Sequence, residues 1–238
     1  MNDNILEVKD LTKIYKSVNK EKTGVFSLNF IVKKGSFHAF IGENGSGKTT
    51  TIKSIISSYT NYTGEILIDN SNVKDNPNIK SKIGYVPESA IFPKELNTNE
   101  YLLYLGCLGS LPKKVVQQKI DYLLEKFNIK NLQYKKPYDF SSGQKKKVLL
   151  IQMLLNDPEL IILDEPAANL DPTARYQLFN LLEELHSKGT TIFISSHILS
   201  EIDKYVDSFT LIHKGKILFN GAKTENLEKV FYEKVIKN

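Results

Sequence analysis

Residues 42–49 carry the side chains whose types and spacing point most directly to chemistry. They read Gly-Glu-Asn-Gly-Ser-Gly-Lys-Thr and match the pattern G-x-x-x-x-G-K-[ST]. In such a loop, glycines let backbone N–H groups approach phosphate oxygens, the lysine adds a positive charge, and the final hydroxyl is suited to bind Mg²⁺ between the outer phosphates. The sequence therefore predicts a loop that binds a nucleoside triphosphate, formed by Gly42, Glu43, Asn44, Gly45, Ser46, Gly47, Lys48, Thr49 and Thr50.

The segments on either side of this loop support the prediction. Residues 36–41 are apolar enough for a buried strand, and residues 50–56 have the pattern of a helix. A helix that starts near Lys48 directs the positive end of its dipole at the phosphates. A chance glycine-rich turn is the competing interpretation, and a strand before the loop with a helix after it disfavours that interpretation.

A second chemical feature is a pair of adjacent carboxylates after an apolar segment. Residues 160–163 are Leu-Ile-Ile-Leu, and Asp164 and Glu165 follow them. Ligands bind at the carboxyl ends of parallel strands, so both carboxylates are expected beside the phosphate loop. We expect Asp164 to hold Mg²⁺, directly or through water, and Glu165 to orient and deprotonate an attacking water. A strand that ends in a solvated acidic turn is the alternative for such a pair taken alone.

The periodicity of apolar residues indicates which elements position these groups. Strand patterns occur at residues 5–8, 25–32, 64–69, 160–163 and 190–195, with a last strand pair around Gly215. In the second half of the chain, helical patterns lie between the strands. This order predicts an α/β fold with a mostly parallel core sheet flanked by helices.

Between residues 97 and 128 the period is helical, which predicts an inserted helical lobe. Asn97 and Glu100 have the spacing of a capping box. One helix face is expected to carry Tyr101, Leu105 and Leu108, and we expect Cys107 to be a small core residue of this apolar helix.

Composition limits the class of protein. The chain has 238 residues, 41% of them hydrophobic, which predicts a soluble globular protein of one or two domains. It has no apolar run long enough to span a bilayer and no signal-peptide pattern at its start, so a cytoplasmic location is expected. The net charge of +5 permits a nucleic acid or an anionic membrane surface as partner, but the lysines are scattered and demonstrate neither.

Together these motifs make the chain resemble the ATP-binding subunits of ABC (ATP-binding cassette) transporters over nearly its whole length. Besides the phosphate loop and the Asp-Glu pair, further segments follow the family's order: a Q-loop at residues 85–88, a signature at 140–144, a D-loop at 169–171 and Ser-Ser-His at 195–197. The resemblance implies one ATP-binding domain over residues 1–238. Its expected fold is that of P-loop NTPases, with an N-terminal antiparallel β subdomain and a helical subdomain over about residues 89–150 inserted in the α/β core.

The resemblance also implies roles for individual residues. Tyr15 matches the aromatic residue that stacks on adenine, although packing on the outer face of a strand is equally compatible with the sequence. His197 matches the histidine that contacts the γ-phosphate, beside Lys48 and the catalytic base Glu165. In this family two cassettes pair head to tail, and the signature of one closes over the ATP of the other. The residues that take part in that contact are Ser141, Ser142, Gly143, Gln144 and Asp171.

Two positions depart from the family pattern. Ser142 replaces the first of two glycines in the signature, and Glu88 replaces the glutamine of the Q-loop. Glu88 retains the ability to bind Mg²⁺ but brings a negative charge near phosphate. Both variants are similar to those of antibiotic, lantibiotic and sodium exporters. The single arginine, Arg175, is expected either to anchor the D-loop through a bidentate pair with a carboxylate or to be an exposed helix residue.

The function implied by the resemblance is an ATPase with ATP and Mg²⁺ that dimerises on ATP and drives separate transmembrane permease subunits in export. The second cassette is either identical or different, and the expected location is the inner face of the cell membrane. A soluble cassette acting on nucleic acid or ribosomes is the alternative. Such relatives usually carry tandem cassettes, coiled coils or zinc-binding insertions, so no nucleic-acid partner is expected. A GTPase is disfavoured because no N-K-x-D segment occurs.

Overall fold

Two sheets organise the chain, for which the computed structural model describes residues 3–15, 23–89, 91–109 and 111–237. The first sheet is antiparallel and has four strands in the order β2-β1-β4-β5. These strands are β1 (Asn4–Tyr15), β2 (Thr23–Lys33), β4 (Thr63–Ile68) and β5 (Ser71–Asn72). The prediction of an N-terminal antiparallel sheet is confirmed.

The second sheet has six strands in the order β10-β9-β3-β8-β7-β6. Its members are β3 (Phe37–Ile41), β6 (Ile83–Val86), β7 (Leu160–Leu163), β8 (Thr191–Ser196), β9 (Ser208–His213) and β10 (Lys216–Ala222). Among the described residues its neighbouring strands run parallel, except for the antiparallel pair of β9 and β10. Strands β3, β7 and β8 are buried along their whole length, as expected for central strands covered on both faces.

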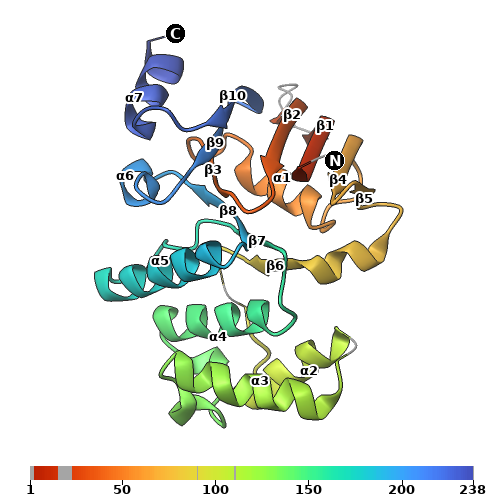
Figure 1. Cartoon of the computed structure of the whole chain (residues 1–238), viewed down its shortest axis with the longest axis vertical. Helices are drawn as coiled ribbons and strands as arrows, with labels where there is room; N and C mark the ends of the chain where they lie inside the picture. The colour runs from red at the N-terminus through yellow and green to blue at the C-terminus, as the bar shows by residue number, and fades with distance from the viewer. Residues whose placement is uncertain (1–2, 16–22, 90, 110, 238) are drawn as a thin grey trace.

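Helices connect and cover these strands (Figure 1). They are α1 (Lys48–Ile55), α2 (Thr98–Leu108), α3 (Lys113–Lys126), α4 (Ser142–Leu154), α5 (Pro172–Ser187), α6 (Leu199–Ile202) and α7 (Leu227–Phe231). Single turns of 3₁₀-helix lie at Lys130–Leu132 and Pro137–Asp139, a longer 3₁₀ segment at Pro77–Lys82, and a π-helical turn at Tyr232–Ile236. Helices α2, α3 and α4, here named the helical lobe, gather at the end of the molecule away from the antiparallel sheet.

Three phenylalanines join the two sheets. Phe30 of β2 stacks on Phe40 of β3 with ring centroids 5.4 Å apart, and Phe193 of β8 lies 5.4 Å from Phe40 and 6.2 Å from Phe30. All three are buried, together with the apolar face of α1. This packing fixes α1, the helix that follows the phosphate loop, between the two sheets.

The helical lobe follows the sequence pattern except on one face of α2. The capping box of Asn97 and Glu100 is present. The buried face carries Leu102 and Gly106, however, whereas Leu108 is 67% exposed and Cys107 is exposed. The prediction that Cys107 is a core residue is therefore wrong, whereas Tyr101, Leu105 and Leu108 do share one face of α2, the end of which is exposed.

The physical reason lies in the contact between α2 and α3. A Cβ placed on Gly106 would lie 2.4 Å from Val116 of α3, so the glycine lets the two helices approach closely and sets which face turns inward. Cys107 and Leu108 follow Gly106 directly and therefore point away from this contact.

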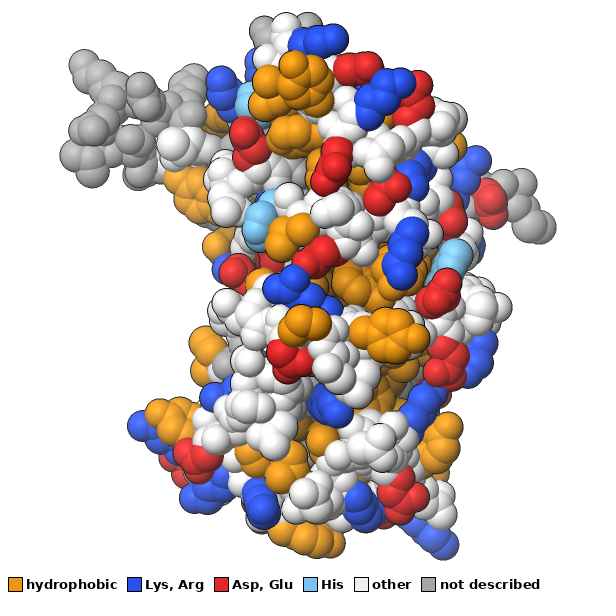
Figure 2. Space-filling view, turned by 90° about the vertical axis from the view of Figure 1, so that its left-hand side faces the viewer, with side chains coloured by type: hydrophobic (Ala, Val, Ile, Leu, Met, Phe, Trp, Pro, Cys, Tyr) orange, Lys and Arg blue, Asp and Glu red, His pale blue; other side chains and the backbone are white. Residues whose placement is uncertain are grey.

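Charged side chains of both signs are interspersed on the face drawn in Figure 2. That face shows no continuous basic stripe of the kind that tracks a nucleic-acid backbone. Within the described parts of the chain, every helix is too short or too polar to cross a bilayer.

Candidate active site

The ends of three neighbouring strands bring the predicted chemistry to one edge of the sheet. In the pairing of β3 with β8, Ile41 lies opposite Ser196, and in the pairing of β7 with β8, Leu163 lies opposite Ile194. Gly42, Asp164 and His197 follow directly after these strands. Their side chains and loops therefore emerge together, as ligand-binding segments do at the carboxyl ends of parallel strands.

The phosphate loop has the close backbone packing that its glycines predict. Gly45 and Gly47 have φ angles of 79° and 113°, which side chains with a Cβ rarely adopt. A Cβ on Gly42 would lie 2.3 Å from the carbonyl oxygen of Ile212. Helix α1 begins at Lys48, so its unpaired N-terminal amides face the loop.

Lys48 holds the loop and the carboxylate of Glu165 together. Its ammonium donates hydrogen bonds to the carbonyl oxygens of Gly42 at 2.7 Å and Glu43 at 3.2 Å. It also lies 3.2 Å from Glu165 Oε1, and both side chains are nearly buried. Removal of either side chain would leave the other charge buried without its partner.

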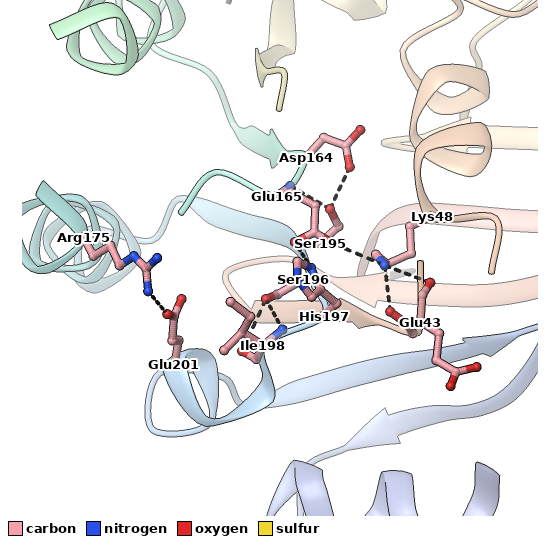
Figure 3. A network of polar contacts seen from close by, with 11 residues as sticks. Glu43, Lys48, Asp164, Glu165, Arg175, Ser195, Ser196, His197, Ile198 and Glu201 are labelled. Atoms are coloured by element: carbon pink, nitrogen blue, oxygen red, sulfur yellow. Dashed lines mark hydrogen bonds and ion pairs between the residues drawn. The ribbon is translucent and has the colours of Figure 1, made fainter. Parts of the chain in front are cut away.

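Ser195 fixes the geometry of the two adjacent carboxylates (Figure 3). Its hydroxyl donates to Asp164 Oδ1 at 2.8 Å and accepts from the backbone N–H of Glu165 at 2.9 Å. Glu165 has a φ of 45°, a left-handed conformation that turns it away from the strand direction. The carboxylate of Glu165 meets His197, whose Nδ1 lies 2.9 Å from Oε2.

A hollow of about 230 Å³ lies over the phosphate loop. It is lined by Glu43, Asn44, Gly45, Gly47, Lys48, Thr49, Thr50, Glu88, Glu165 and His197. The structure thus gathers the phosphate-loop residues, the Q-loop glutamate, Glu165 and His197 around one space. Asp164 is buried and is not among the lining residues, but it retains a carboxylate oxygen beyond the one bonded to Ser195.

Tyr15 lies beside the first turn of α1. Its hydroxyl is 3.1 Å from Thr50 Oγ1, and its ring meets Tyr59 edge to face at 6.4 Å. The side chain is 37% exposed, and partial burial raises the pKa of its hydroxyl. The ring is therefore accessible next to the phosphate loop, which is compatible with the predicted stacking on adenine.

The signature residues lie outside the hollow. Ser141 caps α4 and shares a capping box with Gln144. Ser142 Oγ donates to the carbonyl oxygen of Asn169 at 3.0 Å, so the residue that departs from the family pattern ties the signature to the D-loop. Asp171 caps α5 by accepting a hydrogen bond from the Ala174 N–H. Within one chain, the signature and D-loop residues therefore lie together, and none of them lines the hollow over the phosphate loop.

Arg175 is an anchor of the D-loop rather than a free surface residue. Its Nε donates to the carbonyl oxygen of Leu170 at 2.9 Å, and its guanidinium pairs with Glu201 of α6. The predicted pairing with a carboxylate is present, with one bond to Glu201 in place of a bidentate pair. Because α6 follows His197, this link connects the D-loop to the histidine turn.

Sequence reasoning missed Lys146 in α4. Its side chain is 5% exposed, and its ammonium donates to the carbonyl oxygens of Pro87 at 3.1 Å and Glu88 at 3.3 Å. Burial lowers the pKa of this amine to about 8, while the charges of Glu88 and Asp164 oppose that shift. The available signal was helical spacing: Leu149 and Leu150, three and four positions after Lys146, lie on the same face of α4 and are buried.

Comparison with known proteins identifies the family. The family model described as ABC transporter matches residues 25–168. The chain belongs to the ABC transporter family. A putative ABC transporter ATP-binding protein of Mycoplasma pneumoniae is 52% identical over 228 residues, which cover 94% of this chain and 68% of that protein.

Two further relatives support the same assignment. The bacitracin transport ATP-binding protein BcrA of Bacillus licheniformis is 38% identical over 93% of this chain and 72% of its own length. The solved structure of an ATP-binding subunit of an ABC transporter superposes with a TM-score of 0.85 and is 31% identical, covering 96% of this chain and 98% of that one. The chain is thus an ABC transporter ATP-binding subunit with the P-loop NTPase fold, and an ATPase. Subunits of this family bind ATP or ADP and work with transmembrane components.

Proposed function

We propose that this ABC cassette hydrolyses ATP at a site completed by a second cassette, and that the ATP-dependent pairing powers a separate transmembrane permease in export. The observation that carries the proposal is the separation of two parts of the site. Lys48, Glu165 and His197 line one hollow, whereas the signature residues Ser141 and Gly143 lie outside it. A second copy that turns its signature toward the hollow supplies the missing donors at a helix N-terminus.

In this proposal the γ-phosphate of ATP lies between Lys48 and His197. Glu165 is the group that accepts a proton from the attacking water, because its side chain lines the hollow, where Ser195 accepts from its backbone N–H and His197 contacts its carboxylate. Before this step, when ATP binds, Lys48 transfers its contact from Glu165 to phosphate oxygens. Tyr15 stacks on the adenine, and Ser142, Gln144 and Asp171 belong to the face presented to the partner's nucleotide.

The oxygen donors around the hollow fit Mg²⁺. Thr49 and Glu88 line the space, and Asp164, next to the lining residue Glu165, has a second carboxylate oxygen that Ser195 does not engage. These are the hard donors that Mg²⁺ prefers, and one or two carboxylates with phosphate and water satisfy its coordination. When bound, the ion neutralises charge that develops on the phosphates.

The docking site proposed for the permease is the exposed face of α2 together with the segment after Glu88. Tyr104 and Leu108 are 63% and 67% exposed, and Ile91 is 88% exposed. Phe92 packs on Tyr101 at 5.0 Å, which places this segment against α2. Exposed apolar side chains that cluster are typical of protein contacts. Docking there places the cassette on the inner face of the cell membrane through its partner.

A role in export is supported by the relatives and by the two variant positions. The 38% identity with a bacitracin transport ATP-binding protein supports transport as the process. Ser142 and Glu88 resemble the variants found in exporter cassettes.

The test uses Glu165→Gln. This substitution keeps the shape and removes the proton acceptor, so ATP is expected to bind without hydrolysis and to hold two cassettes together. Light scattering with saturating Mg-ATP is expected to show a dimer that the nucleotide-free protein does not form. The control is the double variant Lys48→Ala/Glu165→Gln, which lacks the phosphate contact and is expected to stay monomeric. A Glu165→Gln protein that hydrolyses ATP at the wild-type rate would remove Glu165 from its role.

A further inference from the structure

Lys146 is a buried lysine that the catalytic proposal does not use. Lysine is rarely buried unless its charge is paired, because removal of an ammonium from water is costly. The flanking lysines of α4 behave differently. Lys145 lies 5.8 Å from the Tyr138 ring, and Lys147 donates to the carbonyl oxygen of Phe127 at 3.1 Å. Both of these are more exposed than Lys146.

The partners of Lys146 belong to the Q-loop segment. Its ammonium donates to two consecutive carbonyl oxygens, those of Pro87 and Glu88. These bonds cross from the signature helix to residues 58 and 59 positions earlier in the chain. They hold the backbone from which the Glu88 side chain reaches the phosphate-loop hollow.

The hydrogen bond to the Glu88 carbonyl oxygen also brings this ammonium into the charge environment of the site. Glu88 and Asp164 are the acidic groups whose charges act on Lys146, and both are the proposed Mg²⁺ ligands. The negative charge that Glu88 brings near phosphate is therefore opposed by the positive charge of an ammonium that is hydrogen-bonded to the backbone of the same residue.

We propose that Lys146 is a positioning residue that ties the Glu88 segment to the signature helix and balances the charge of the Glu88 carboxylate. The proposal rests on the proposed function, in which Glu88 faces the nucleotide and the signature faces the partner. Movement of α4 toward a partner's ATP is then transmitted to Glu88 through the two carbonyl contacts. Charge balance explains how a carboxylate is compatible with triphosphate binding at this position.

A purely structural role predicts a different outcome. The aliphatic stem of Lys146 lines a hollow of about 300 Å³ between α3, α4 and α5, together with Phe127, Leu150 and Leu178. If the stem alone matters, methionine is an adequate replacement because it has a similar length and is apolar. Lys146→Met therefore separates the charge from the packing.

The experiment compares Lys146→Met, Glu88→Gln and the double variant. For Lys146→Met we expect hydrogen exchange in the peptide over residues 85–92, measured without nucleotide, to become about tenfold faster, because two hydrogen bonds from a charged donor are lost. We expect the KM for Mg-ATP to rise about tenfold, because the Glu88 charge is then unbalanced. Adding Glu88→Gln restores the KM but not the exchange rate, since the carbonyl contacts remain absent.

The matched control is Lys145→Met, which removes a lysine from the same helix and is expected to leave both measurements unchanged. Wild-type exchange in Lys146→Met would overturn the tie to the Glu88 segment, and a raised KM that Glu88→Gln does not restore would overturn the charge balance. Failure of the proposed function is recognised separately, because it would appear in the unsubstituted protein as absent ATP binding.

Discussion

Ser195 shows how much of the proposed site depends on one hydroxyl. It is fully buried and connects Asp164 to the backbone of Glu165, whose φ of 45° places the carboxylate between Lys48 and His197. Loss of the hydroxyl leaves a buried carboxylate oxygen and a buried N–H without this partner. Such unsatisfied groups cost about 1–3 kcal/mol.

We therefore expect Ser195→Ala to lower the free energy of unfolding by about 1–3 kcal/mol and to reduce kcat more than it raises the KM for ATP. Urea unfolding and steady-state ATPase measurements test this. Ser196→Ala is the control, because the Ser196 hydroxyl bonds within its own turn to Ile198. Equal effects of the two substitutions would show that the Ser195 bridge has no special role.

The residues that could be predicted from the sequence are those whose chemistry lies in contiguous motifs. The phosphate loop, Asp164 and Glu165, and His197 each follow a strand, and strand order brings them to one edge. Contacts between segments that are distant in the sequence could not be predicted from contiguous motifs. Ser195 meets Asp164 across 31 positions, Arg175 meets Glu201 across 26, and Lys146 meets Glu88 across 58, so each depends on tertiary packing rather than on local pattern.

Among the elements, strand β3 carries a buried titratable residue close to the phosphate loop. It leads into the phosphate loop and carries His38, whose ring nitrogens lie 2.8 Å from the hydroxyls of Ser208 and Thr210. The imidazole also stacks on Phe193. Complete burial lowers the pKa of His38 from 6.5 to about 3, so the folded protein keeps this imidazole neutral.

This shift predicts a pH dependence of stability. Below pH 6.5 the unfolded chain takes up a proton at His38 that the folded chain does not accept until about pH 3, so stability is lost as the pH falls through this window. Because of this group, the free energy of unfolding falls by up to about 1.4 kcal/mol for each pH unit within the window. His38→Gln is expected to show a shallower slope in urea unfolding between pH 6 and 4.5. Above pH 7.5 the two slopes are expected to coincide, and parallel slopes in acid would contradict the assignment.

The turn after β8 and the D-loop are joined by a single ion pair. Arg175 of α5 contacts both the Leu170 carbonyl and Glu201 of α6, and the two side chains are partly exposed. A pair with this exposure contributes about 1 kcal/mol or less to stability. Its larger effect is expected on the position of His197 relative to the D-loop.

We expect Arg175→Met and Glu201→Gln each to reduce kcat about tenfold through misplacement of His197, with small changes in melting temperature. The double variant is expected to be no worse than either single variant, because both remove the same contact. Lys229→Met, which breaks the exposed pair with Glu225, serves as the control. Additive losses in the double variant would argue against a shared role.

For the whole molecule, the apolar face of α2 gives a test of how the cassette meets its permease. Tyr104→Glu/Leu108→Glu places two charges on this face, at side chains that are exposed and so do not support the core. The variant is expected to retain ATP-dependent dimerisation and lose capture of a membrane protein from detergent extracts. Tyr134→Glu, at a tyrosine that is 76% exposed and lies between α3 and α4, is the control. Undiminished capture by the double variant would exclude this face as the docking site.

The contact of Lys48 with Glu165 bears on when water can attack the nucleotide. As long as the ammonium lies 3.2 Å from Oε1, the carboxylate that should receive a proton is engaged by a cation. A triphosphate that draws the ammonium to its own oxygens frees this carboxylate at the moment when the nucleotide is in place. In the proposed mechanism the substrate thus activates the base, and a nucleotide too short to reach Lys48 is expected to leave the carboxylate engaged and hydrolysis off.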